Sequence, residues 1–207
     1  ALTNTSPTIT GTNGNVSVPA NTPFMLTATA TDPNGDPLTY NWEQMNNQVS
    51  TQPPVATSTG GPNFRSYSPT TSPTRYFPNL TDLANGGPFT WEVLPSVTRT
   101  MNFRVTARDN ATGGGCTDYV DVTLDIDGNS GPFIVTYPSA TGIVWNGLTT
   151  ETVTWDVANT DLAPVSCATV DILLSTDGGL TYPTVLATNT PNDGSHPITV
   201  PNTPTTT

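Results

Sequence analysis

The sequence predicts an all-β protein made of two consecutive antiparallel β-sandwiches, and three observations support this. Apolar and polar residues alternate in short runs along most of the 207 residues, which is the pattern of strands with one buried face. The 21 prolines and 17 glycines supply turns between these runs, yet their share stays below the level that indicates aperiodic disorder. Hardly any segment has the 3.6-residue period of a helix.

The first sandwich is predicted from four alternating runs, Phe24–Thr31, Leu38–Glu43, Met101–Ala107 and Tyr119–Ile126. The short turn DPNGD, residues 32–36, separates the first two runs. Because two strands joined by so tight a turn usually pair with each other, we expect a hairpin here.

A long insertion rich in Pro, Ser and Thr, at about residues 45–96, interrupts this sandwich. A structureless loop of that length is improbable in a compact domain. We therefore expect further strands around Phe64–Tyr67 and Tyr76–Pro78, and a helical turn at Leu80–Ala84.

The second sandwich follows a linker at Asp127–Gly131. Its predicted strands are Phe133–Tyr137, Thr152–Val157, Val170–Ser175 and Val185–Thr188.

The predicted domain boundaries are therefore 1–130 and 131–207. The second domain is short compared with the ~100 residues of an immunoglobulin-type sandwich. We expect that its last strand is missing or is supplied by a neighbouring chain. Such an arrangement leaves a sheet edge open to strand exchange with another subunit.

The charge balance restricts the partners. The chain has sixteen carboxylates, five arginines and no lysine, which gives a net charge of −11. So acidic a surface repels phosphate backbones, so nucleic acid is excluded as a partner. It suits a secreted or cell-surface protein that associates with cations or neutral polymers. No apolar run approaches the ~20 residues of a membrane span, and the polar start ALTNTSPT is typical of a mature piece of a longer precursor.

Catalysis is not expected from this chain. His196 is the only histidine, so neither an HExxH zinc site nor a Cys/His zinc cluster can form. The GxSxG turn of serine hydrolases is absent as well.

A calcium site is predicted at the DPNGD turn. Asp32, Asn34 and Asp36 place three oxygen-bearing side chains at alternate positions, where they can converge on Ca²⁺. Asp109 and Asp118 are additional candidate ligands if their strand ends lie next to the turn. The alternative is a plain turn in which Asp and Asn side chains bond backbone amides.

A second motif resembles the Asp-box, a hairpin signature of the form S-x-D-x-G-x-T-W. Its residues here are Ser175, Asp177, Gly179, Thr181 and Tyr182, with tyrosine in place of tryptophan. The resemblance implies a structural turn over a packed aromatic ring. A loop that contacts carbohydrate is the alternative.

The four tryptophans fall into two groups. Trp42 and Trp155 lie within strand patterns and are expected in the core. Trp91 and Trp145 lie beside Gly and Asn, where an exposed ring could contact a surface ligand such as a sugar.

The two cysteines, Cys116 and Cys167, are too few for a disulfide framework. They could form one disulfide between the two domains, or remain separate thiols.

A family resemblance rests on several stretches in order. TATATDPNGDPLTYNWEQM resembles bacterial PKD and cadherin-like modules. Together with FRSYSPTTSPTRYFPNL, EVLPSVTRTMNFRVTARDN and VTWDVANTDLAPVSCATVDILLSTDGGLTYP, it is similar to the region after the catalytic domain in secreted reprolysin-like zinc metalloproteases of bacteria related to Cytophaga and Flavobacterium. The resemblance implies a PKD/cadherin-like module, a second Ig-like module, and an HExxH domain upstream of Ala1. No zinc ligand of that family matches a residue here.

Three functions are therefore open. The first is a non-catalytic accessory segment of a secreted metalloprotease, which supports its own catalytic domain or holds a polymeric protein or glycan substrate. The second is a cell-surface adhesin or carbohydrate-binding module. The third is a self-assembling subunit completed by strand donation.

Overall fold

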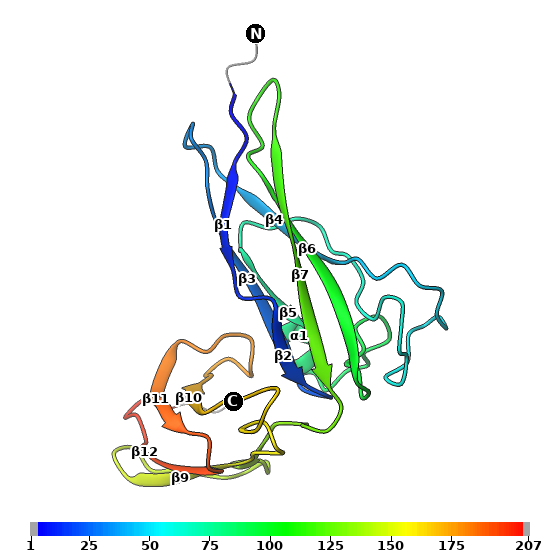
Figure 1. Cartoon of the computed structure of the whole chain (residues 1–207). Helices are drawn as coiled ribbons and strands as arrows, with labels where there is room; N and C mark the ends of the chain where they lie inside the picture. The colour runs from blue at the N-terminus through cyan, green and yellow to red at the C-terminus, as the bar shows by residue number, and fades with distance from the viewer. Residues whose placement is uncertain (1–3, 205–207) are drawn as a thin grey trace.

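A computed structural model describes residues 4–204. In this range the chain is nearly all β, with twelve strands and one short helix, and the strands form a β-sandwich architecture as predicted. Figure 1 shows an elongated N-terminal half with a smaller C-terminal half at one of its ends. No helix in the described range is long and apolar enough to cross a membrane.

The N-terminal half consists of two facing sheets (Figure 1). The three-stranded sheet has the order β1 (Thr8–Thr12), β3 (Phe24–Thr31), β5 (Thr74–Phe77). The four-stranded sheet has the order β2 (Val16–Pro19), β7 (Thr117–Asp127), β6 (Arg99–Arg108), β4 (Thr39–Gln44).

The predicted hairpin at residues 32–36 is wrong. β3 pairs with β1 and β5, whereas β4 pairs with β6 in the opposite sheet. The turn therefore carries the chain across the sandwich. This crossing lets Leu26 on β3 and Trp42 on β4 enter the same core from its two sides, and each is at most 2% exposed.

The pairing is also not purely antiparallel, because β2 runs parallel to β7, with Val16 opposite Leu124. β1 and β2 follow each other in one direction but join different sheets. The crossing lies at Gly14, where a Cβ atom would collide with the side chain of Val122. Glycine therefore lets the backbone pass close to β7 as it changes sheets.

The insertion contributes directly to the core. Phe64 and Phe77 pack edge-to-face at 5.2 Å between ring centroids, and Phe24 stacks on Phe77 at 5.0 Å. The predicted helical turn is confirmed as α1 (Leu80–Ala84). Around Phe64, however, only a single bridge to Glu92 forms where a strand was predicted.

The C-terminal half contains a three-stranded and a two-stranded sheet (Figure 1). The strands are β12 (Ser195–Thr199), β9 (Thr150–Asp156) and β8 (Ile134–Tyr137) in the first sheet, and β10 (Thr169–Leu174) and β11 (Thr184–Pro191) in the second. Its core is smaller than that of the N-terminal half, with four buried apolar residues: Val153, Trp155, Ile198 and Val200.

The segment between the halves is packed instead of being a free linker. Ser130 is 1% exposed. The amide of Gly131 donates to the carbonyl of Ala158 at 2.8 Å, and the amide of Phe133 donates to Thr22 Oγ1 at 3.0 Å. Both halves thus hold this segment. The assignment of the halves to PKD/cadherin-like and immunoglobulin-like domains stays a prediction.

Candidate functional site

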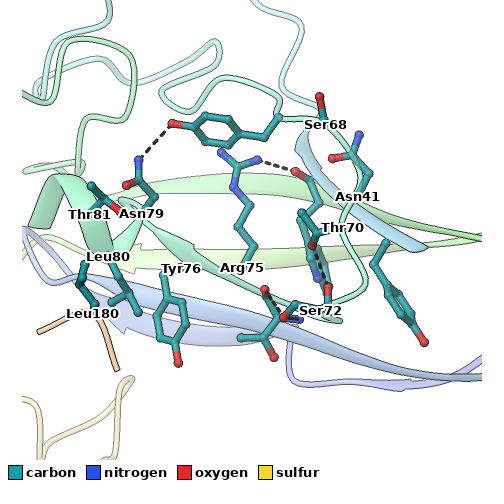
Figure 2. A pocket seen from close by; sticks show the side chains of 14 residues that line it. Asn41, Ser68, Thr70, Ser72, Arg75, Tyr76, Asn79, Leu80, Thr81 and Leu180 are labelled. Carbon is teal, nitrogen blue, oxygen red and sulfur yellow. Dashed lines mark hydrogen bonds between the residues drawn. The ribbon is translucent and has the colours of Figure 1, made fainter. Parts of the chain in front are cut away.

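A cleft of about 470 Å³ lies where the insertion, which includes β5, meets strand β4 (Figure 2). Its lining is aromatic and polar. We call it the tyrosine cleft, and the residues that line it are Tyr40, Asn41, Trp42, Tyr67, Ser68, Thr70, Ser72, Thr74, Arg75, Tyr76, Asn79, Leu80, Thr81 and Leu180.

A buried ion pair forms the base of the tyrosine cleft. Arg75 Nη2 donates to Glu92 Oε1 at 2.6 Å, and the two side chains are 12% and 2% exposed. The same guanidinium donates to the backbone carbonyls of Trp42 and Arg65. Its charge is therefore compensated within the protein, and it ties β5 to β4 and to an earlier part of the insertion.

Asn79 links this base to the rim. Its backbone amide donates to Glu92 Oε2 at 2.7 Å, and its side-chain oxygen caps α1 by accepting from the amide of Asp82 at 2.9 Å. Its Nδ2 donates to Tyr67 Oη at 3.1 Å, the dashed line between these two residues in Figure 2. One amide side chain thus positions both the helix and a tyrosine of the cleft.

Tyr67 keeps its proton at neutral pH. Burial is the main cause that raises its pKa, and the negative charge of Glu92 adds to this, against the opposing hydrogen bond from Asn79. The ring stacks over the Arg75 guanidinium, 4.7 Å from its carbon atom to the ring centroid. Since the phenol oxygen already accepts from Asn79, its hydrogen can donate to a ligand.

The exposed surface of the cleft combines ring faces with neutral hydrogen-bonding groups. Tyr67 and Tyr76 are 39% and 38% exposed, and the labelled hydroxyl and amide side chains of Asn41, Ser68 and Thr70 lie along the other side in Figure 2. Leu180, from the turn between β10 and β11, contributes the end beside Leu80. This surface can stack on a ring and hydrogen-bond neutral polar groups.

The predicted calcium residues fall into a hydrogen-bonded network. Asp32 Oδ1 accepts from the amides of Asn34 and Asp36 at 2.8 and 3.1 Å, which closes the turn. Asn34 Oδ1 accepts from the amide of Thr5 at 2.9 Å. Asp118 Oδ2 accepts from the amide of Ile9, also at 2.9 Å.

Asp109 is fully buried in the same network. It accepts from the amide of Cys116 at 2.8 Å and from Asn4 Nδ2 at 2.7 Å. Burial alone would raise the pKa of Asp109, but these hydrogen bonds outweigh it and the pKa is lowered. Within residues 4–204 no three His, Cys, Asp or Glu side chains gather closely enough to hold a metal ion, so calcium binding stays a prediction.

The Asp-box-like residues form a closed turn. Ser175 Oγ donates to Asp177 Oδ1 at 2.7 Å and accepts from the amide of Gly179 at 2.8 Å. Thr181 donates to Asp177 from its hydroxyl at 2.6 Å and from its amide at 2.9 Å. The pKa of Asp177 is lowered to about 2, first by the Thr181 hydroxyl and then by the Thr181 amide. Tyr182 is 46% exposed, and its hydroxyl lies against the turn, 3.3 Å from the position that a Cβ atom at Gly179 would take.

Three of the four tryptophans lie as their positions predict. Trp42 and Trp155 are 2% and 6% exposed. Trp91 is 44% exposed but lies outside the lining of the tyrosine cleft. Trp145 is half-buried, and its Nε1 donates to Tyr137 Oη at 3.1 Å.

Of the two alternatives for the cysteines, the structure has separate thiols at Cys116 and Cys167. Cys116 lies in the loop between β6 and β7, at the end of the N-terminal half that points away from the C-terminal half (Figure 1). Cys167 precedes β10 in the C-terminal half, so a disulfide between them is ruled out by their placement.

The tyrosine cleft was not predicted from the sequence. A signal was present in β5, because its alternation puts Phe77 into the core and leaves Tyr76 on the outer face. Arg75 of the same strand contacts Glu92 and Tyr67, which lie outside β5. The sequence alone could not pair these residues.

No protein-family model, curated protein or solved structure matches this chain.

Proposed function

We propose that this chain is a non-catalytic module of a secreted bacterial protein that holds a neutral polymeric substrate, a glycan chain, in the tyrosine cleft. The observation that carries the proposal is the lining of the cleft. Exposed tyrosine rings stand among hydroxyl and amide side chains, and the one ionic lining residue, Arg75, is already paired with Glu92.

The chemistry of a glycan matches this lining. A sugar ring offers an apolar face to Tyr67 or Tyr76, and its hydroxyl groups can bond the Asn, Ser and Thr side chains at the rim. A charged ligand would gain little, since Arg75 is already compensated and 12% exposed.

A binding role without catalysis is supported by the position of the ionisable groups. His196 lies on β12 in the C-terminal half, and Glu92 is committed to Arg75 and Asn79. Neither is placed to activate water over a ligand in the cleft.

The experiment is a glycan array, followed by calorimetric titration of the strongest neutral oligosaccharide. We expect Tyr76→Ala and Tyr67→Ala each to weaken binding about tenfold, which corresponds to about 1.4 kcal/mol. Tyr119→Ala is the matched control, because Tyr119 is a 56% exposed tyrosine on β7 outside the cleft. Trp91→Ala tests the alternative that the exposed Trp91 ring contacts the sugar, and this variant should bind normally. Equal affinity of Tyr76→Ala and the unmodified protein would contradict the proposal.

The metalloprotease context is a separate part of the proposal and rests on the family resemblance. In this context the module positions substrate for its own catalytic domain. The open reading frame upstream of Ala1 should then encode an HExxH domain. A reading frame without one would leave the adhesin alternative, with the same cleft.

A further inference from the structure

A second, apolar groove of about 390 Å³ opens between the two sheets of the C-terminal half. Trp145, Trp155, Val153 and Leu186 are among its lining residues, and Asp171 is its one carboxylate. The core of this half is therefore incompletely filled. An apolar cleft that reaches the surface of a sandwich is a place where a partner gains by covering it.

The groove borders the edge of a strand. Five consecutive residues of β10, 170–174, line it. Because successive side chains of a strand point to opposite faces, a consecutive run shows that the backbone edge itself borders the groove. Within the described range β10 pairs with β11 alone, so the backbone groups along its other edge have no strand partner. A two-stranded sheet gains stability from a third strand.

The opposite wall is equally open. β8 contributes Val135 to the groove and is an edge strand of its own sheet. All four of its residues are exposed although three are large and apolar: Ile134, Val135 and Tyr137. An exposed apolar edge without charged residues is a template for strand addition.

The charge of this half selects the partner. Residues 131–207 contain six carboxylates, at 151, 156, 161, 171, 177 and 193, and no lysine or arginine. If the C-terminal half of a second copy covered the groove, two halves with six carboxylates each and no cation would meet, which costs affinity. A strand from a basic polypeptide would instead meet complementary charge, with Asp171 at the groove.

We propose that this groove accepts an extended strand of a separate, basic polypeptide, which pairs with the free edge of β10 and places alternate apolar side chains between β10 and Trp155. This is strand addition, in which the backbone bonds supply affinity and alternate side chains supply specificity. The tyrosine cleft takes no part in it.

The probe is a synthetic seven-residue peptide that alternates Val and Thr between terminal Lys residues. We expect it to bind at least tenfold more tightly than the same peptide with Glu at both ends. A central Pro, which cannot donate to a strand, should abolish binding. Hydrogen exchange at residues 170–174 should slow at least tenfold when the Lys peptide is bound.

Three variants locate the site. Trp145→Ala should weaken binding of the Lys peptide at least tenfold. Asp171→Asn, which retains the Oδ1 acceptor for the amide of Asn189, should reduce the preference for Lys over Glu without affecting folding. Leu162→Ala removes a 56% exposed apolar residue that does not line the groove and should bind normally.

Three results would overturn the proposal. The first is peptide binding that leaves hydrogen exchange in β10 unchanged, and the second is no binding by any of the peptides. The third is protection of β10 that rises with protein concentration in the absence of peptide, since this would identify a second copy of the chain as the occupant. Glycan binding by the tyrosine cleft should be unchanged in all three variants, which separates this proposal from the proposed function.

Discussion

Asp177 illustrates how a single residue can organise a turn. Its carboxylate accepts from the hydroxyl and the amide of Thr181, from the amide of Leu180 and from the Ser175 hydroxyl. Ser and Asp at these spacings bond the backbone in place of water. This turn also holds Leu180 at the end of the tyrosine cleft.

The stability of this turn should depend on pH through the carboxylate of Asp177. The pKa of Asp177 is lowered to about 2 from its ordinary value of 3.8. A lowered pKa means that the folded state favours the ionised form, so the stabilisation is complete above about pH 4 and is lost as the pH falls towards 2. Titration of the Asp177 carboxyl carbon by NMR should show a midpoint near 2. In Thr181→Val, which removes the main cause, the midpoint should rise towards 3.8. A midpoint near 3.8 in the unmodified protein would contradict the hydrogen-bonded turn.

Asp36 offers the sharpest test of the calcium prediction. Its half-buried carboxylate accepts no hydrogen bond from the residues the structure describes, and neither do the buried atoms Asn4 Oδ1 and Asp32 Oδ2 in the same network. Replacing Asp36 therefore leaves the turn intact and removes only a potential ligand.

For calcium we expect an increase in Tm. An ion that binds only the folded state at one hundred times its Kd adds about 2.7 kcal/mol to the free energy of unfolding. Differential scanning calorimetry in the presence of calcium and in the presence of EDTA measures this change in Tm. Asp36→Asn should remove the response, whereas Asp161→Asn, at an exposed position of the C-terminal half, should retain it. Identical Tm values with calcium and with EDTA would contradict the calcium prediction. The network would then serve only to close the turn by hydrogen bonds.

At the scale of the element, β5 shows why the insertion is structural. Phe77 is 0% exposed and packs on Phe24, Phe64 and Phe103 with ring centroids 5.0 to 5.2 Å away. Arg75 lies over the Phe77 ring, 4.4 Å from its guanidinium carbon to the ring centroid, and both Arg75 and Tyr76 line the cleft. The same four residues serve packing and site.

Removing the Phe77 ring should therefore be costly. We expect Phe77→Ala to lower the free energy of unfolding by about 3–5 kcal/mol, because the ring leaves a cavity among three others. Val49→Ala, at a fully exposed position of the same insertion, should change it by less than about 0.5 kcal/mol. Urea denaturation measures both. Similar, small effects of the two substitutions would mean that the insertion is not part of the core.

At the scale of the whole molecule, the two halves share a packed junction. Gly131 has φ of 87°, its amide bonds the C-terminal half, and a Cβ there would collide with the carbonyl of Ala20 in the N-terminal half. Leu180 reaches the tyrosine cleft from the C-terminal half as well. The relative position of the halves therefore helps to shape the proposed site.

Gly131→Ala tests the junction against a matched glycine. Gly142 also has positive φ, 83°, but open space surrounds its Cβ position. We expect Gly142→Ala to cost about 1 kcal/mol from backbone strain alone. Gly131→Ala should cost a further ~1–3 kcal/mol from overpacking, with a change in the radius of gyration by small-angle scattering. Equal losses in the two variants would show that the halves do not meet at this residue.

Much of the local structure was predictable, because alternation and turn residues act within a few positions of one another. Phe24–Thr31 and Leu80–Ala84 match β3 and α1 at both ends. Three strands were not predicted, β1, β2 and β12, since each has at most five residues and contains Gly or Pro. His196 lies in the last of these strands.

The all-β class, the acidic surface and the order of most strands thus follow from the amino-acid sequence, because strand formation and charge are properties of neighbouring residues and of composition. Sheet membership and both clefts depend on packing between residues far apart in the chain. The alternation in β3 and β4 is the same whether they pair with each other or face each other. Burial of Leu26 and Trp42 in one core, together with the hydrogen bond from Arg75 on β5 to the carbonyl of Trp42 in the opposite sheet, selects the second arrangement.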